Sequence, residues 1–340
     1  MTPATQEISR DDDARPRRDA WRRTRAHLWG IVLAGGEGRR LAPFIRACLG
    51  SDRPKQYCAL LDHRSMLAHT LGRAGRLIRP EHLLTIVTAP HLAYARAELH
   101  DRPAETLIVQ PQNRETAPGI LLPLLHVHRR DPEAVVVLLP ADHFIWEEAP
   151  FMAAVARAAA FVHEHPHIPV LLGVDPRWPE VDYGWIEPGA PLGQVRGAMV
   201  SRVRRFWEKP AAPQAEALYR QGCLWNILVL VARAEALVAL FEAFAPALMH
   251  AFDPIRQALG SAREHTVVRE VYATLPASNF SQAILARCPE RLGVLRVGRV
   301  YWSDWGDAAR IQQDRARFGL RGLQGGAIVP RAPVARLPAP

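Results

Sequence analysis

The first apolar run of the chain, which begins at Trp29, ends in the stretch Leu33-Ala34-Gly35-Gly36-Glu37-Gly38-Arg39-Arg40-Leu41-Ala42-Pro43. Three glycines within four residues let backbone amides approach a bound phosphate closely. The stretch lacks the Gly-Lys-Ser/Thr of a P-loop, and Leu41 stands at the third glycine position of a dinucleotide fingerprint. A plain turn is the alternative for such a loop taken alone, but the two arginines directly after the glycines favour a phosphate site.

Further apolar runs alternate with helical patterns, and this alternation indicates the fold class. The runs cover 83–88, 106–110 and 134–139, and patterns suited to helices cover 65–79, 91–99, 115–130 and 150–164. Strands alternating with helices predict an α/β protein with a doubly wound, mostly parallel sheet. Ligands of such folds bind beyond the carboxyl ends of the strands, so the polar residues that follow each run are the candidates for a site.

Composition excludes several classes of protein. The 340 residues are 49% hydrophobic and 23% charged, which suits a globular chain with a sizeable core. No apolar stretch approaches the length of a transmembrane helix, so we expect no membrane partner. The net charge of +9 comes from 41 Arg and two Lys, and the arginines are spread along the chain, so we expect no nucleic-acid partner. The two lysines, Lys55 and Lys209, mark positions where a compact ammonium is needed rather than a planar guanidinium.

The ends of the chain differ from the segment between them. Residues 1–26 are polar and Arg-rich, and residues 321–340 contain Gly325-Gly326 and several prolines, so we expect two disordered tails around one domain at 27–320. The N-terminus has no apolar segment typical of a secretion signal. The cysteines Cys48, Cys58, Cys223 and Cys288 form no CxxC pair, which is typical of a reduced, cytoplasmic protein.

The glycine loop, together with Pro54-Lys55-Gln56, resembles the signature of the sugar-1-phosphate nucleotidyltransferases, and most closely the mannose-1-phosphate guanylyltransferases. Further motifs of that family stand in the same order between about residues 29 and 310. They are Asn113-Arg114-Glu115-Thr116-Ala117-Pro118, Pro140-Ala141-Asp142-His143, Tyr183-Gly184-Trp185-Ile186-Glu187, Glu208-Lys209-Pro210, Trp225-Asn226 and Trp302-Ser303-Asp304-Trp305-Gly306. The resemblance implies a Rossmann-like sheet of the nucleotidyltransferase type.

The resemblance also implies roles for individual residues. Arg40 and Lys55 would be catalytic, and Asp142 and Asp304 would hold Mg²⁺. Without the resemblance, Asp142 and Thr116 could equally be helix caps. Nucleotide contacts would come from Ala34, Gly35, Gly36, Gly38, Gln112, Asn113, Thr116 and Ala117. Sugar-phosphate contacts would come from Gly184, Glu187, Glu208, Lys209 and Asn226.

The implied reaction joins GTP and mannose 1-phosphate to give GDP-mannose and pyrophosphate, with Mg²⁺ as cofactor. Two alternatives stay open: the same chemistry on another pair of nucleotide and hexose 1-phosphate, or a non-catalytic protein that binds nucleotide sugars. Ile227 and Leu228 replace a small residue and a glycine of the family pattern, and the segment Ser278-Asn279-Phe280-Ser281 lacks the Asp that is usual there. A second copy of the chain is a further candidate partner.

Overall fold

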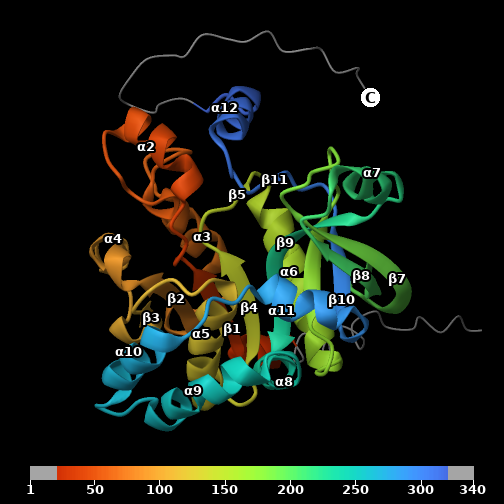
Figure 1. Ribbon diagram of the computed structural model, residues 1–340. Helices are drawn as coiled ribbons and strands as arrows, with labels where there is room; N and C mark the ends of the chain where they lie inside the picture. Colours follow the sequence, from red (N-terminus) through yellow and green to blue (C-terminus); the bar gives the residue numbers. More distant parts are fainter. Residues whose placement is uncertain (1–20, 321–340) are drawn as a thin grey trace, which may run out of the picture.

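The computed structural model describes residues 21–320, which form a mixed sheet covered by helices on both faces (Figure 1). The sheet has nine strands in the order β3-β2-β1-β4-β9-β6-β10-β8-β7. Strands β3, β2, β1 and β4 are parallel to one another, whereas β9 runs antiparallel to both β4 and β6. The strands are β1 (Leu28–Leu33), β2 (Leu83–Thr88), β3 (Leu107–Gln110), β4 (Val135–Pro140), β6 (Val170–Val174), β7 (Gly184–Val195), β8 (Ala198–Glu208), β9 (Leu224–Arg233) and β10 (Gly293–Val297).

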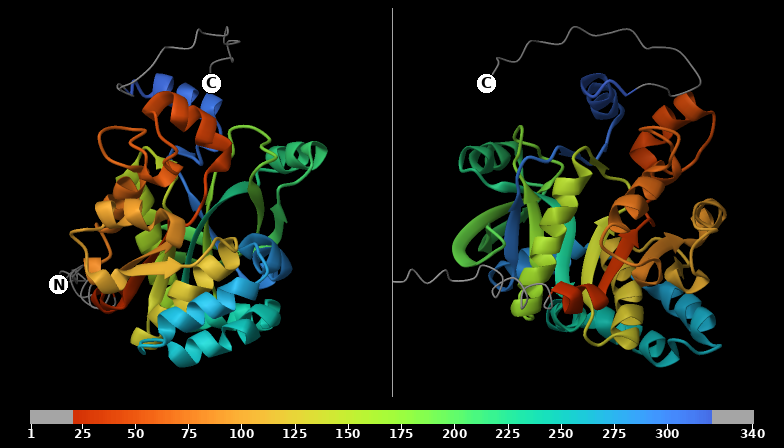
Figure 2. Two further views of the ribbon diagram at one scale, coloured as in Figure 1. Left: turned by 60° about the vertical axis from the view of Figure 1, so that its left-hand side comes forward. Right: turned by 180° about the vertical axis from the view of Figure 1, so that it is seen from behind.

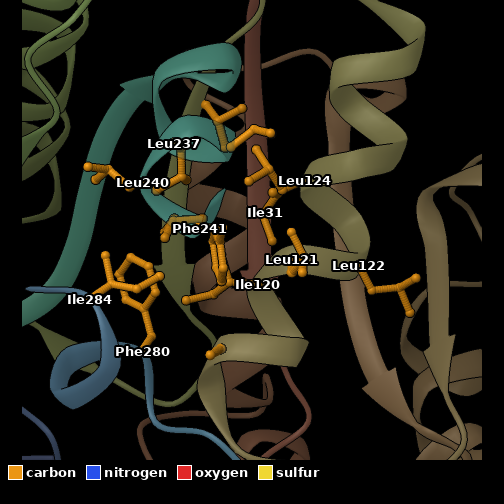
Figure 3. Close-up of a cluster of buried hydrophobic side chains, with 14 of the residues drawn as sticks. Ile31, Ile120, Leu121, Leu122, Leu124, Leu237, Leu240, Phe241, Phe280 and Ile284 are labelled. Atoms are coloured by element: carbon orange, nitrogen blue, oxygen red, sulfur yellow. The ribbon is translucent and has the colours of Figure 1, made fainter. Parts of the chain in front are cut away.

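Two layers of helices bury the two faces of this sheet. The central strand β4 is buried along its whole length, as its run of apolar residues requires. One face is covered by α5 (Thr116–Arg130), α8 (Ala234–Phe244), α9 (Pro246–Ala258), α10 (Glu264–Thr274) and α11 (Phe280–Ala283), and the other by α3 (Met66–Ala74), α4 (Leu92–Glu98), α6 (Glu148–Glu164) and α7 (Ala212–Arg220). Figure 3 shows the first core, where Ile31 of β1 meets Ile120 of α5 and Phe241 of α8.

The helices α2 (Ala42–Leu49) and α12 (Ala308–Arg317) lie above the end of the sheet (Figure 2). A third, smaller apolar cluster contains residues of both helices. Its centre is Phe144, whose ring stacks on that of Trp305 with the centroids 4.6 Å apart. Beside it, β5 (Phe144–Ile145) pairs antiparallel with β11 (Trp302–Ser303). This short ladder joins the segment after β4 to the segment before α12.

The predicted fold class is confirmed, and the differences from it have local causes. The run at 83–88 coincides with β2, while the helix expected over 65–79 ends at Ala74, where the poor helix former Gly75 follows. The disorder expected for residues 1–26 is wrong for residues 21–26, which are helical and pack Trp21 against the core. The rest of that tail and the tail expected at 321–340 lie outside the described residues.

Candidate active site

The carboxyl ends of β1, β3 and β4 open into one cavity of about 330 Å³. Four residues expected to contact a nucleotide line this cavity together with one of the expected metal ligands. They are Gly35, Gly36, Asn113 and Thr116, with Asp142. The parallel strands therefore bring the separate motifs to one edge of the sheet, as expected for a doubly wound fold.

The side chain of Gln56, which follows Lys55 in the sequence, holds the glycine loop in place. Its buried side-chain amide donates hydrogen bonds to the carbonyls of Ala34 and Gly36, at 2.9 and 2.8 Å. Gly38 has a φ of 62°, in the left-handed region that favours glycine, and packs beside the backbone of Lys55. The loop and the lysine are thus one preorganised unit.

Lys55 is almost completely buried, with 4% of its surface exposed, and it lies on the short helix η2 (Lys55–Tyr57). Its Nζ is 2.8 Å from Oδ2 of Asp142 and donates a hydrogen bond of 2.5 Å to the backbone carbonyl of Asp304. A second carbonyl, that of Trp305, lies 3.4 Å away. The ammonium therefore joins the two segments that the β5–β11 ladder brings together.

The two carboxylates beside Lys55 are both held in the ionised form. Burial alone would raise the pKa of Asp142, but the Lys55 ammonium outweighs it and holds this pKa below its usual value. Asp304 is half-buried, and its pKa is lowered because Tyr183 and Arg310 donate to Oδ1, each at 2.6 Å. The amide of Gly306 donates to the same oxygen at 3.0 Å. Among these contacts of residues 21–320, Oδ1 of Asp142 and Oδ2 of Asp304 are left to take a further ligand.

His143, next to Asp142, is neutral. The indole of Trp302 donates to its Nδ1 at 3.1 Å, and burial lowers the pKa of the imidazole to about 4. The loop that carries both residues is fixed by α3, because Thr70 donates to the carbonyl of Ala141 at 3.3 Å and the buried Arg73 donates to that of His143 at 3.0 Å.

Three of the residues expected at the sugar phosphate share one face of the sheet. Gly184 of β7 is paired with Glu208 of β8 and with Asn226 of β9. A Cβ at Gly184 would lie 3.0 Å from Oε2 of Glu208, so the glycine makes room for that carboxylate. Burial raises the pKa of Glu208, partly offset by Lys209 and a hydrogen bond from Ser281. Lys209 itself is exposed. It is the first residue after β8 and has a φ of 51°.

Comparison with known proteins places this geometry in a family. The model of the nucleotidyl transferase family matches residues 29–313, which covers the glycine loop, Lys55 and both carboxylates.

The chain belongs to the nucleotidyl transferase family.

Relatives of this nucleotidyl transferase support the narrower resemblance. This chain is 29% identical over 284 residues to the xanthan biosynthesis protein XanB of Xanthomonas campestris pv. campestris (strain B100). The match covers 81% of this chain and 57% of the relative. The chain is 28% identical over 286 residues to the mannose-1-phosphate guanylyltransferase of Escherichia coli K12, covering 82% and 58%. The chain therefore spans little more than half the length of these relatives.

A solved structure agrees with the sequence relatives. A Thermus thermophilus protein, described as a mannose-1-phosphate geranyltransferase, matches with a TM-score of 0.69 at 28% identity, covering 82% of this chain and 76% of that one. The predicted resemblance to the sugar-1-phosphate nucleotidyltransferases, and within them to the mannose-1-phosphate guanylyltransferases, is confirmed. None of the helices within residues 21–320 is both long and apolar enough to cross a membrane.

The fold of this nucleotidyl transferase does not bring every expected residue to the cavity. Glu187 lies on the opposite face of β7 from Gly184, in a separate hollow beside Cys223, and pairs with Arg204 at 2.9 Å. Successive side chains of a strand point to opposite faces of the sheet, so two residues that are three positions apart, such as Gly184 and Glu187, face opposite ways. Arg40 is exposed, and its Nη1 lies 3.3 Å from Oδ2 of Asp182.

Two residues of the segment after β3 serve the neighbouring helices. Gln112 donates its side-chain amide to the carbonyl of Tyr272 at 2.7 Å. Ala117 is buried, and its amide donates to the carbonyl of Ser278 at 2.9 Å. The Thr116 hydroxyl, which does line the cavity, accepts from the amide of Phe280 rather than capping α5.

Sequence reasoning missed several residues that the structure places in the site. Gln110, the last residue of β3, is buried in the cavity wall against Gly35, and Gln56 anchors the glycine loop. Gln56 stands within a quoted motif. Gln110 ends the predicted run at 106–110, and the alternation of buried residues along that strand was a signal for it. Arg310 lies outside every motif, and only the docking of α12 reveals its contact with Asp304.

Proposed function

We propose that this nucleotidyl transferase moves a guanylyl group from GTP to mannose 1-phosphate, giving GDP-mannose and pyrophosphate. The observation that carries the proposal is the buried Lys55, which pairs with Asp142 in the lining of the glycine-loop cavity and donates to the backbone carbonyl of Asp304. The choice of guanine and mannose rests on the names of relatives such as the E. coli mannose-1-phosphate guanylyltransferase. The coarser activity, transfer of a nucleotidyl group to a sugar 1-phosphate, rests on the family and the geometry together.

The chemistry needs charge stabilisation more than proton transfer. An oxygen of the sugar phosphate attacks the α-phosphorus in line, the bond from that phosphorus to the oxygen shared with the β-phosphate breaks, and pyrophosphate leaves with the bonding electrons. The second pKa of a sugar phosphate is about 6, so the attacking group is already an anion at neutral pH. Two unit charges 4 Å apart repel by about 4 kcal/mol at an effective dielectric of about 20. Cationic side chains must offset this repulsion.

Three cationic side chains would each meet a different phosphate group. Lys55, fixed by its buried contacts, would meet the α-phosphate at the reaction centre. Arg40, at the exposed end of the glycine loop, would leave Asp182 and take up the β- and γ-phosphates. Lys209, exposed beside Glu208, would hold the sugar phosphate. Preorganised charges of this kind act by positioning and by stabilising developing charge.

The residues present fit a magnesium ion that is completed by the substrate. Within residues 21–320, no three His, Cys, Asp or Glu side chains are grouped closely enough to hold a metal alone. Asp142 and Asp304 each leave one carboxylate oxygen for a ligand, and Mg²⁺ commonly takes one or two carboxylates plus phosphate oxygens and water. When bound, Mg²⁺ would neutralise charge on the phosphate oxygens. A cytoplasmic location, a second copy as partner and the absence of a nucleic-acid partner stay predictions.

Pyrophosphate release tests the proposal. The purified protein is incubated with Mg²⁺ and a grid of the four ribonucleoside triphosphates against several hexose 1-phosphates. Turnover confined to GTP and mannose 1-phosphate is the expected result. Turnover with another pair would keep the reaction class and replace the substrates. Absence of turnover across the grid, with GDP-mannose still binding, would overturn the enzymatic proposal in favour of a nucleotide-sugar sensor.

A further inference from the structure

We propose that Arg310, together with Lys55, offsets the negative charge of the Asp142–Asp304 pair, so that a divalent cation enters this site with the nucleotide and binds the free protein only weakly. The inference rests on the proposed function, because it takes the two carboxylates as the cation site. It adds a role for a residue that no motif contains.

The contacts place one cation against each carboxylate. Lys55 Nζ lies 2.8 Å from Oδ2 of Asp142, and Nη1 of Arg310 lies 2.6 Å from Oδ1 of Asp304. Both cations are shielded from water, with side-chain exposures of 5% for Lys55 and 14% for Arg310. Solvent therefore screens these charges less than those of a surface pair.

Three further titratable side chains face this cluster, and two of them share the charge of Arg310. His143 adds no charge, because its Nδ1 accepts a hydrogen bond from Trp302. Glu180 contacts the other arm of Arg310, Nη2, at 2.7 Å, and Asp307 lies 3.5 Å from the same atom. These two carboxylates weaken the field of Arg310 on its far side, but they do not replace the cation that meets Asp304.

Each of the two carboxylates therefore contacts a cation, and this contact offsets much of the attraction that the pair would exert on a free divalent cation. A nucleoside triphosphate changes this, because its phosphates bring negative charge and further oxygen ligands. The geometry thus points to entry of the metal as a complex with the nucleotide. Arg310 is a positioning and charge-balancing residue in this account and touches no reacting atom.

Loss of the Arg310 charge is expected to uncover affinity for the free cation. In Arg310→Gln the orientation of Asp304 is preserved, because Tyr183 and Gly306 still donate to Oδ1 at 2.6 and 3.0 Å. What the variant loses is a positive charge beside the cation site, which should tighten binding of free Mn²⁺ by at least about tenfold. Arg310→Lys keeps the charge and should bind Mn²⁺ as weakly as the wild type.

The experiment is a Mn²⁺ titration of the full chain without nucleotide, read by electron paramagnetic resonance. Wild type, Arg310→Gln and Arg310→Lys are compared with Arg317→Gln, which removes an α12 arginine that packs on Tyr301 and Phe318 instead. Adding Asp304→Asn to Arg310→Gln should abolish the gained binding, which assigns it to this pair. Thermal unfolding of each variant confirms that the fold is intact.

Two results would overturn the inference. One is equal Mn²⁺ affinity in Arg310→Gln and wild type, and the other is tight binding by the wild type that Asp304→Asn removes. Either outcome leaves the proposed reaction standing if the substrate grid shows turnover. A failure of the proposed function would appear separately, as a grid without turnover.

Discussion

The buried Lys55 ammonium pairs with the half-buried Asp142 carboxylate, which lines the cavity beside the glycine loop, and Nζ lies 2.8 Å from Oδ2. The same ammonium binds the Asp304 carbonyl, so one of only two lysines in the chain ties together both expected metal ligands. An arginine would not fit here without moving one of the two segments, since its planar fork is larger than an ammonium.

Replacement of this lysine should affect catalysis more than binding. We expect Lys55→Ala to lower kcat for pyrophosphate release by at least about 10²-fold, the scale of one lost preorganised charge contact. The matched control is Arg46→Ala, which removes an exposed cation paired with Asp52. Steady-state kinetics check this, and a near-normal kcat for Lys55→Ala would remove the lysine from the mechanism.

Asp304→Asn should raise the Mg²⁺ concentration needed for half-maximal turnover. The amide keeps the size of the side chain but loses the negative charge that a hard cation prefers. A magnesium titration of the initial rate measures the effect, with Asp175→Asn as the control, because Asp175 pairs with Arg296 at the surface. An unchanged titration curve would argue against Asp304 as a metal ligand.

A methyl group at Gly35 should weaken nucleotide binding. Its Cβ would lie 2.6 Å from Nε2 of the buried Gln110, so either the loop or the amide must move within the cavity wall. We expect Gly35→Ala to raise KM for the nucleotide with little change in KM for the sugar phosphate. Gly72→Ala is the control: in the exposed face of α3 its Cβ meets nothing closer than 3.8 Å, and it should stabilise the fold by about 0.5–1 kcal/mol.

Leu228 occupies a position that favours glycine and should influence substrate choice. Its φ is 51°, and it lies in a bulge of β9, two residues after Asn226. Leu228 lines the cavity, whereas the neighbouring Ile227 is buried in the core. Leu228→Gly relieves backbone strain of about 1–2 kcal/mol. It also removes a partly buried side chain whose burial stabilises the fold by a similar amount. We therefore expect little change in stability and a shift in the ratio of kcat/KM between competing substrates. Identical ratios in the two proteins would show that Leu228 does not shape the pocket.

Stability should fall on acidification partly through His91. Burial lowers the pKa of this imidazole below its usual value of 6.5, so the unfolded chain binds the proton more readily than the folded one. The free energy of unfolding therefore decreases as the pH drops below about 6.5, and His91→Gln should show a shallower decrease. Urea unfolding at pH 7.5 and 5.5 compares the two slopes. Parallel slopes would mean that His91 does not contribute.

The sequence was most informative where apolar runs and motifs coincide. The run at 83–88 predicts β2, and the polar residues after β1 and β4 do meet at one cavity. The antiparallel edge was not predicted, because β7 and β8 are half exposed and β7 is interrupted by Pro188 and Pro191, so their alternation is weak.

Side-chain direction was the other limit of sequence reasoning. Glu187 stands in a family motif and Gln112 directly precedes one, but whether such a side chain faces the cavity depends on strand pleat and loop path. Arg310 could not be found at all, since its contact with Asp304 depends on how α12 docks on the third apolar cluster. Tertiary contacts decide these positions, and no local pattern encodes them.

The pairing of β5 with β11 leads us to expect that catalytic competence arises late in folding. His143 and Trp302, in contact beside this ladder, are 159 residues apart in sequence. Closing so long a loop has a high entropic cost, and the two-residue ladder alone cannot compensate for it. The sheet between them must form first, so a growing or partly unfolded chain can have an assembled glycine loop and still lack a reaction centre.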